Sequence, residues 1–200
     1  MKTFDIEVKE RETGKKASKK LRQKGLVPVN LYGQGKNYNL CADERLLNKI
    51  YFTPDTYVIN IKYNNEVKKA IIKEVQLHPV TDRIMHVDLY EISEDKPFEV
   101  ELPIKITGVA KGVQMGGKLV QEKKFLKVKG LLKDMPDYIE IDVTNLGLGK
   151  TLHVKDLKLD KLTIVNRPED TIVKVEVTRL AKEEIQTQQQ AQTTTSATTT

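Results

Sequence analysis

Apolar and polar side chains alternate in short runs along most of the chain, which is the pattern of β-strands that bury one face. Residues 3–9 show this alternation first. Residues 57–63 and 67–72 repeat it on either side of Asn64-Asn65-Glu66, whose asparagines favour a hairpin turn. Further strands are expected at residues 29–32, around 38–41 and from about 85 to 92. The pattern predicts a β-rich N-terminal domain over residues 1–92.

Two segments of this domain carry a helical pattern instead. Residues 17–24 place apolar side chains four positions apart, and Gly25 can end this helix. Its other side chains are almost all lysine and arginine. Residues 44–51 place leucines and an isoleucine on one face, and Asp43 can cap their first turn. We therefore expect two short helices, of which the first is strongly basic.

The alternation starts again after residues 93–97, a polar and acidic segment that ends in proline and suits a linker. Strands are expected at residues 98–106, 125–129, 138–143 and 172–177. Glycines at positions 108, 112, 116 and 117 predict a long loop after the first of them. Residues 98–180 thus predict a second β domain of the sandwich or barrel type, so the fold class is mainly β. Residues 181–200, rich in Gln and Thr, are expected to form a disordered tail.

Composition narrows the class of protein. The hydrophobic fraction is 38%, charged residues make up 31%, and tryptophan is absent, which is typical of small domains with charged surfaces. The sequence contains neither an apolar stretch long enough to span a membrane nor a signal peptide, so we expect a cytoplasmic protein without a membrane partner. The single cysteine, Cys41, cannot form an internal disulfide and is expected to be a buried apolar residue.

The positive charge is concentrated in one place. The net charge is +6, and residues 9–24 alone hold eight lysines and arginines against two glutamates, so the rest of the chain sums to zero. The basic residues are Lys9, Arg11, Lys15, Lys16, Lys19, Lys20, Arg22 and Lys24. Clustered cations displace the counterions that condense on phosphates, so this segment indicates a nucleic-acid partner. The alternative is an ordinary solvated helix face.

The sequence offers little catalytic chemistry. Gly149-Lys150-Thr151 resembles the end of a phosphate-binding loop, but Thr144 stands where that motif needs its first glycine. His86 and Asp88 lie two apart on a predicted strand, without a third metal ligand or a nucleophile near them in the sequence, and His78 and His153 add no such partner. We therefore expect no enzyme activity, no cofactor, no metal and no small-molecule substrate.

Gln76, His86 and Asp88 are better explained as hydrogen-bonding groups on a sheet surface. Together they supply donors and acceptors, and both are needed to bind base edges and 2′-hydroxyls in the minor groove of RNA. An aspartate is not expected to approach phosphates, so it points to bases or riboses. The alternative, that Asp88 only orients His86, stays open.

Two sequence blocks resemble a known family. Arg11-Glu12-Thr13-Gly14-Lys15-Lys16-Ala17-Ser18-Lys19-Lys20-Leu21-Arg22-Gln23-Lys24-Gly25 and the residues that follow, up to Gly33, are similar to the opening signature of the bL25 family of bacterial large-subunit ribosomal proteins. Val75-Gln76-Leu77-His78-Pro79 and His86-Val87-Asp88 resemble its second motif. Residues 100–104 and 112–119 resemble the second domain of the longer form, the CTC type of general stress protein.

The resemblance implies a six-stranded β-barrel that binds the loop E region of 5S ribosomal RNA in the central protuberance of the large subunit, with the RNA and proteins of that region as further partners. The RNA-binding residues that it implies are Arg11, Lys19, Lys20, Tyr32, Gln76, His86 and Asp88. Lys15, Lys16 and Arg22 are added as predicted RNA-binding residues because they belong to the basic segment. Lys19 and Lys20 stand where the family often has arginines, which makes two-pronged phosphate contacts weaker. Asn30 occupies a position that is usually small or apolar.

Three functional hypotheses follow. The first is a structural constituent of the ribosome, located in the cytoplasm. The second is a cytoplasmic RNA-binding stress factor that acts off the ribosome. The third is a small enzyme whose basic segment attracts its substrate. Neutralising Lys19, Lys20 and Arg22 without loss of function would count against both RNA hypotheses.

Overall fold

The computed structural model describes residues 1–64, 66–157, 159 and 161–178. The described chain is mainly β, as predicted. It forms two compact units, of which the first combines the described residues of 1–103 with 127–138 and 161–163, and the second contains the remaining described residues. The disordered tail predicted at residues 181–200 lies outside the described residues.

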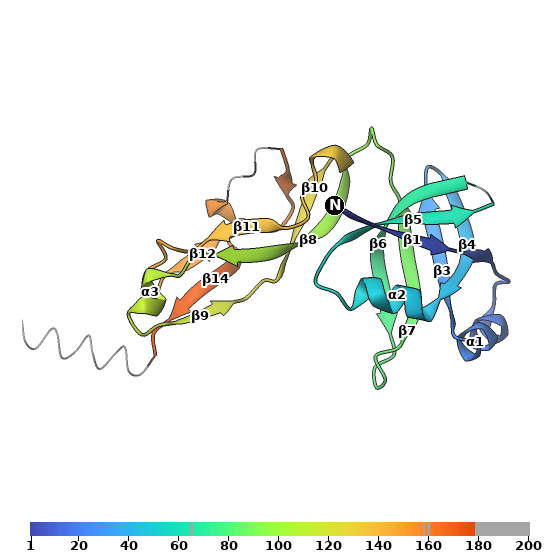
Figure 1. Ribbon diagram of the computed structural model, residues 1–200, viewed down its shortest axis with the longest axis horizontal. Coiled ribbons are helices and arrows are strands. Elements are labelled where there is room, and N and C mark those ends of the chain that lie inside the picture. The colour runs from blue at the N-terminus through green and yellow to red at the C-terminus, as the bar shows by residue number, and fades with distance from the viewer. Residues whose placement is uncertain (65, 158, 160, 179–200) are drawn as a thin grey trace, which may run out of the picture. The chain divides into compact units, whose positions relative to one another are not determined.

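One curved sheet makes up most of the first unit and can be followed in Figure 1. Its strands are β1 (Lys2–Glu7), β2 (Lys9–Glu10), β3 (Leu26–Gly33), β4 (Lys36–Asp43), β5 (Tyr57–Tyr63), β6 (Glu66–Leu77) and β7 (Ile84–Glu91). They are hydrogen-bonded in the order β1-β5-β6-β7-β3-β4-β2. β1 and β2 are the two edge strands in this order, and only Val8 separates them in the sequence. One continuous segment therefore joins the two edges of the sheet. The sheet closes into a barrel of six strands when β1 and β2 are counted as one.

The predicted strand at residues 3–9 is thus divided into two. β1 runs parallel to β5, with Lys2 beside Tyr57, whereas β2 runs antiparallel to β4, with Lys9 beside Cys41. The change of partner at Val8 interrupts the strand, and period-two alternation alone cannot reveal such a change. The alternation nevertheless continues across the interruption, because Ile6 of β1 and Val8 between the two strands both join the barrel core.

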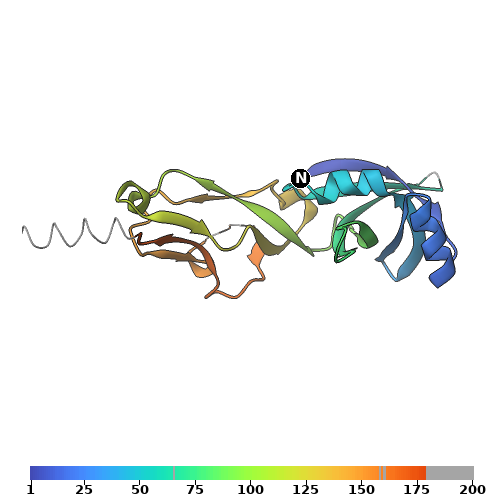
Figure 2. The same cartoon turned by 90° about the horizontal axis from the view of Figure 1, so that it is seen from below.

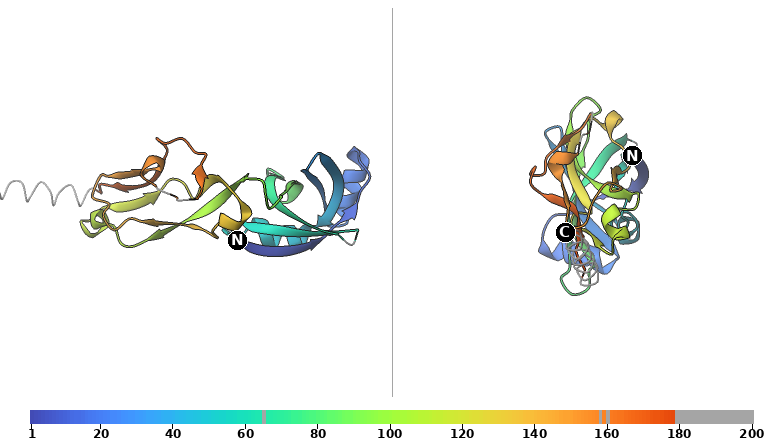
Figure 3. Two further views of the ribbon diagram at one scale, coloured as in Figure 1. Left: turned by 90° about the horizontal axis from the view of Figure 1, so that it is seen from above. Right: turned by 90° about the vertical axis from the view of Figure 1, so that its left-hand side faces the viewer.

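The inward faces of all six strands form the barrel core. The curvature of the sheet around it can be followed in Figure 2 and Figure 3. Val29, Leu31, Ile59 and Leu89 are almost inaccessible to solvent. Cys41 is buried and free, as predicted. Removal of these apolar side chains from water is the main contribution to the stability of the barrel.

Helix α2 (Glu44–Tyr51) links the end of β4 to the start of β5 and so crosses one end of the barrel. Leu47 and Ile50 pack into the barrel core. The Asp43 carboxylate accepts a hydrogen bond of 2.8 Å from the backbone N–H of Arg45, which caps the first turn. The bounds and the cap of this helix were both predicted correctly.

Helix α1 (Lys15–Gln23) lies on the barrel surface beside β3, and none of its residues is fully buried. It starts two residues before the predicted helix, so Lys15 and Lys16 belong to it. Gly14 precedes it with φ 122°, and Gly25 follows it with φ 74°. Both angles lie in the region that glycine adopts most readily, which explains where this helix begins and ends.

Two strands of the barrel extend beyond their predicted bounds. β3 begins at Leu26, before Pro28, because that end of the strand pairs only with β4, and its pairs with β7 begin at Val29. A proline is tolerated where one side of a strand is unpaired. β6 continues to Leu77, well past residue 72, through shifts in register that break its alternation.

The chain after residue 97 forms two further sheets. The strands are β8 (Phe98–Thr107), β9 (Lys118–Gln121), β10 (Phe125–Gly130), β11 (Ile139–Asp142), β12 (Thr151–His153), β13 (Thr163–Ile164) and β14 (Thr171–Glu176). Their orders are β11-β8-β10-β13 and β12-β14-β9. Leu126 and Ile141 from the first sheet and Val173 and Val175 from the second are buried. β8 and β10 contribute residues to both compact units.

The predicted loop at residues 108–117 contains a short helix, α3 (Lys111–Gln114), which the glycine-rich sequence concealed. Backbone N–H groups of Lys111 and Gly112 donate to the carbonyls of Thr144 and Leu146. This packing leaves no room for a side chain at Gly112, where an added Cβ would lie 2.6 Å from backbone atoms of residues 147 and 148. Two 3-10 turns, Leu132–Asp134 and Val154–Asp156, complete the described elements.

Candidate nucleic-acid interface

The outward side chains of β3, β6 and β7 form one polar surface on the barrel wall. Val87 and Leu89 of β7 point into the core, so His86, Asp88 and Tyr90 point outward. Strand register then places a neighbour beside each of them. We call this surface the polar sheet face, and it consists of Asn30, Tyr32, Glu74, Gln76, His86, Asp88 and Tyr90.

His86 and Asp88 touch each other on this face. Their Nδ1 and Oδ1 atoms are 3.4 Å apart, and their side chains are 17% and 26% exposed. Burial lowers the pKa of His86, and Arg11 and Arg22 lower it further, although Asp88 and Glu74 act in the opposite direction. The imidazole is therefore neutral at pH 7, with one nitrogen that donates and one that accepts. The contact supports an orienting role for Asp88, and both side chains stay open to a ligand.

Tyr32 and Tyr90 lie beside them in neighbouring strands. Their rings meet edge to face, with centroids 5.8 Å apart. Burial raises the pKa of Tyr32, and the charges of Asp88 and Glu74 raise it further. The Tyr32 hydroxyl thus keeps its proton and can donate a hydrogen bond to an oxygen of a ligand.

Two arginines from the basic segment border the polar sheet face. Arg11 Nη2 donates a hydrogen bond of 2.9 Å to Asn30 Oδ1. Arg11 Nε is buried and has no hydrogen-bond partner among the described residues. Arg22 reaches from α1 to donate from Nε to the Met85 carbonyl oxygen at 3.1 Å. Both guanidinium groups are therefore held beside the outward side chains of β7.

A cationic groove of about 380 Å³ continues from this face between α1 and the start of β7. Its lining consists of Lys15, Lys19, Arg22, Gln23, Arg83 and Met85. Arg83 is fixed by two hydrogen bonds to the Glu44 carboxylate, of 2.9 and 2.7 Å. These bonds lower the pKa of Glu44, so the pair stays ionised near neutral pH.

Most of the predicted site residues come together in space. Arg11, Arg22, Tyr32, Gln76, His86 and Asp88 lie on or beside the polar sheet face, and Lys15 and Lys19 line the groove. Lys16 and Lys20 are exposed on α1 and line neither. Asn30 stands out in the sequence, but no sequence motif marks Glu74, Arg83, Met85 and Tyr90 as part of this region. Strand register was the missing signal, since it decides which outward residues become neighbours.

The remaining histidines have local partners. His78 Nδ1 accepts long hydrogen bonds from the backbone N–H groups of Val80 and Thr81, within the turn between β6 and β7. His153 Nδ1 contacts the Glu169 carbonyl oxygen at 3.0 Å. No group of three metal-ligating side chains forms within the described part of the chain. Residues 147–150 form a turn between β11 and β12, so they do not open a helix as a phosphate-binding loop does.

A closed β-barrel with a basic surface helix, a cationic groove and a sheet face of mixed donors and acceptors has the features expected of the class of β-barrel proteins that bind nucleic acid. Comparison with known proteins identifies the family within that class. The Ribosomal L25p family model matches residues 6–89, and the model described as Ribosomal protein TL5, C-terminal domain, matches residues 97–179. The chain belongs to the bL25 family of ribosomal proteins, which confirms the resemblance of its motifs.

Curated relatives match nearly the whole length of the chain. The large ribosomal subunit protein bL25 of Azobacteroides pseudotrichonymphae is 40% identical over 186 residues, which cover 91% of this chain and 97% of the relative. The proteins of the same name from Porphyromonas gingivalis and Phocaeicola vulgatus are 38% and 40% identical, and each match covers 91% of this chain and 96% of the relative. None of the described helices is long and apolar enough to cross a membrane.

Proposed function

We propose that this chain is a structural constituent of the bacterial large ribosomal subunit and that its β-barrel binds the loop E region of 5S ribosomal RNA in the central protuberance. The observation that carries the proposal is the polar sheet face with the basic helix α1 beside it. Curated relatives at about 40% identity are named as large ribosomal subunit proteins, which supports the ribosomal assignment. Those names favour it over a stress factor that acts off the ribosome. Assembly into ribosomes places the protein in the cytoplasm.

The two parts of the interface have different tasks in this proposal. Lys15, Lys16, Lys19 and Lys20 are exposed on α1 and contact phosphates, which fixes the position of the RNA. Gln76, His86 and Asp88 meet base and ribose edges, because neutral donors and acceptors suit the wide minor groove of an RNA helix. The neutral imidazole of His86 and the protonated hydroxyl of Tyr32 support this assignment.

We propose a division of the chain into residues 1–92, a linker at 93–97 and a second domain at 98–180. The two family models support this division, since one ends at residue 89 and the other begins at 97. The second domain has a net charge of +3 over residues 98–180, lower than the +6 of residues 9–24 alone, so its expected partners are proteins or peripheral RNA of the same region. No step of this function requires catalysis, a cofactor or a small-molecule substrate.

The test is the affinity of the full-length chain for a loop E fragment of 5S RNA, measured over a series of salt concentrations and against a generic RNA hairpin. We expect selective binding to the fragment that weakens as salt rises. The variant Lys19→Gln/Lys20→Gln should lower the slope of log affinity against log salt by about two, because two phosphates are no longer neutralised by the protein.

The matched control is Lys118→Gln/Lys150→Gln, which removes the same charge from exposed lysines beyond the barrel and should leave affinity and slope unchanged. Equal affinity for the fragment and the hairpin would remove the 5S assignment and leave only a basic surface. His86→Ala should reduce the preference for the fragment with little effect on the slope, because a neutral imidazole releases no counterions.

A further inference from the structure

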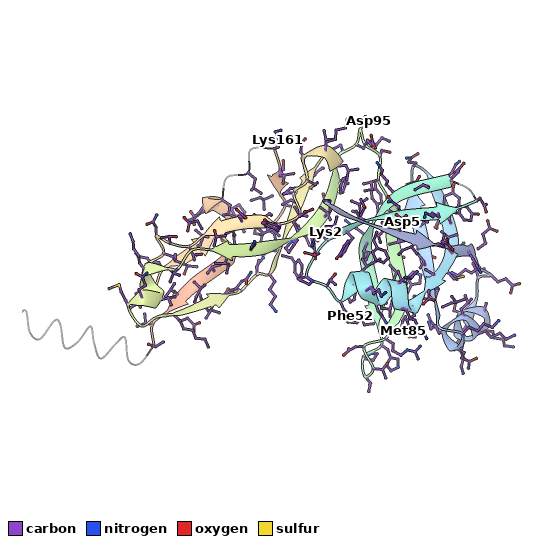
Figure 4. The ribbon with its side chains drawn as sticks, in the orientation of Figure 1. Lys2, Asp5, Phe52, Met85, Asp95 and Lys161 are labelled. Carbon is purple, nitrogen blue, oxygen red and sulfur yellow. The ribbon has the colours of Figure 1, made fainter. Side chains whose placement is uncertain are left out.

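Helix α2 has a solvent-facing side that the proposed RNA interface does not use. At 100° per residue, Arg45, Lys49 and Phe52 fall within about 60° of one another, on the side opposite Leu47 and Ile50. All three are exposed, and the Phe52 ring is 57% accessible to solvent. Figure 4 labels Phe52 at the C-terminal end of the helix. We call Arg45, Lys49 and Phe52 the α2 stripe.

The cations of the stripe are free to meet an external anion. Within the described residues, no carboxylate lies at salt-bridge distance from the side chain of Arg45 or Lys49. Glu44, the acidic residue of the first turn, is instead engaged by Arg83 through two hydrogen bonds. An exposed pair of cations without local acidic partners favours binding to a polyanion.

Phe52 adds a flat apolar surface on the same side of the helix as these charges. Its ring meets that of Tyr51 edge to face, with centroids 5.2 Å apart, which is a favourable arrangement of two aromatic rings. Cations beside an exposed aromatic ring are the arrangement by which proteins bind single-stranded nucleic acid, because a base stacks on the ring while its phosphates meet the cations. A purely apolar protein partner would not require the two charges.

The stripe begins next to the proposed RNA interface. Glu44, in the first turn of α2, lines a small cavity together with Arg22, Arg83 and Met85, three residues that also line the cationic groove. From there α2 crosses the end of the barrel towards the start of β5, away from the polar sheet face. An RNA strand that leaves the main interface at the groove therefore passes the cations first and the aromatic ring last.

We propose that the α2 stripe is a second RNA-binding site, which holds an unpaired nucleotide by stacking its base on Phe52 and its flanking phosphates on Arg45 and Lys49. This inference rests on the proposed function, because it extends the same interface. The RNA segment belongs either to the RNA held at the polar sheet face or to a neighbouring ribosomal RNA. The chemistry of recognition is the same in both cases.

The experiment measures binding of the full-length chain to deproteinised 5S RNA, to deproteinised 23S RNA, and to large subunits depleted of this protein. Phe52→Ala should weaken binding to at least one of the two RNAs about fivefold or more, the effect of losing one stacked base. Phe52→Trp should preserve the affinity and Phe52→Leu should not, because leucine keeps the apolar character but lacks the π surface. Arg45→Gln/Lys49→Gln should lower the salt slope by about 1.4, as expected for two single-strand phosphates.

Two control variants alter the opposite end of the barrel. Lys36→Gln at the start of β4 and Val67→Ala at the start of β6 remove an exposed charge and an exposed apolar side chain, and neither should change affinity. Which of the two RNAs responds to Phe52→Ala identifies the source of the nucleotide. Because Phe52 is largely exposed, its variants should unfold at the wild-type temperature, which a thermal melt checks.

Unchanged affinity of Phe52→Ala for all three probes would overturn the inference. Loss of affinity for the depleted subunits alone, with both RNAs bound as by wild type, would identify a protein as the partner and would also overturn it. Failure of the proposed function can be distinguished from failure of this inference. If the proposed function is wrong, the wild-type chain itself will lack selective binding to the loop E fragment of 5S RNA.

Discussion

His86 combines a partly buried ring with two neighbouring arginines, and this environment has a consequence for stability. Its pKa in the folded chain lies below the ordinary value of 6.5, first because of burial. The unfolded chain therefore binds the proton more readily than the folded one. Stability is highest above about pH 6.5 and decreases as the pH falls through the lowered pKa of the folded state.

We predict that the urea midpoint of the wild-type barrel falls between about pH 7.5 and about pH 5, and that His86→Gln removes much of this fall. This pH range avoids the protonation of carboxyl groups. The pKa values of Glu44 and Asp170, for example, are lowered by their partners, so these groups stay ionised throughout it. An equal fall in the wild type and the variant would mean that His86 does not cause it.

Asn30 holds Arg11 at the edge of the polar sheet face through a hydrogen bond of 2.9 Å. Asn30→Ala should leave the arginine charged but less well oriented. We predict that affinity for the loop E fragment falls about threefold to tenfold, the equivalent of a typical net hydrogen-bond contribution of about 1 kcal/mol, while the salt slope is unchanged. Arg11→Gln is the comparison, because it should reduce both. A lower slope in Asn30→Ala would show that orientation is not its role.

For single residues, the sequence indicated which side chains belong to the polar sheet face better than it indicated which of them lie next to one another. Tyr32, Gln76, His86 and Asp88 were named from motifs, and they lie on one face. Glu74 and Tyr90 belong to the same face, but no motif draws attention to them. Their place follows from the pairs Glu74 with Asp88 and Tyr32 with Tyr90, and these pairs depend on long-range register that local periodicity does not contain.

Among the elements, α2 shows how much a single capping residue contributes. The Asp43 side chain satisfies the backbone N–H of Arg45 in the first turn, where the helix cannot provide a partner. We predict that Asp43→Ala lowers the free energy of unfolding by about 1 kcal/mol, as measured by urea denaturation. Asp43→Asn should retain most of the stability because it can also cap. Equal losses in both variants would point to the charge rather than the hydrogen bond.

A helix with a capping residue and one apolar face was predicted well from the sequence. A strand whose pairing changes along its length was not. α2 has a cap, an apolar face and predicted bounds that hold at both ends. β6 instead shifts register between Ile72 and Glu74 and again between Gln76 and Leu77, so its alternation fails halfway along. α3 was missed because Gly112 disfavours a helix, and tertiary packing against residues 144–148 overrides that preference.

For the whole molecule, the β sheets after residue 97 depend on close backbone packing at Gly112. A methyl group there would lie 2.6 Å from backbone atoms that cannot move independently. We predict that Gly112→Ala lowers the free energy of unfolding of this part by about 1–3 kcal/mol, as measured by urea denaturation, without affecting the affinity for the loop E fragment. Gly147→Ala is the matched control, because its added Cβ would meet only Lys150 Cγ at an ordinary 3.6 Å. Similar stability of the two variants would contradict the role of this packing.

The fold class and the basic helix could be predicted from the sequence, whereas the closure of the barrel could not. Alternation reports which residues are buried but not which strand lies next to which. The six-stranded barrel was expected only from the family resemblance. Its physical basis is the change of partner at Val8, by which one segment holds both β5 and β4.

The strand order also determines when during synthesis the interface can exist. β7 is the last strand of the barrel to be made, yet it lies in the middle of the polar sheet face, between β3 and β6. A nascent chain that ends before Ile84 carries the whole basic segment but lacks His86 and Asp88, and the neighbouring edges of β3 and β6 are unpaired. Such a chain can attract RNA through its charge without recognising it. In the proposed function, selective binding therefore begins only when the last strand has been inserted, so the RNA distinguishes a finished barrel from an unfinished chain.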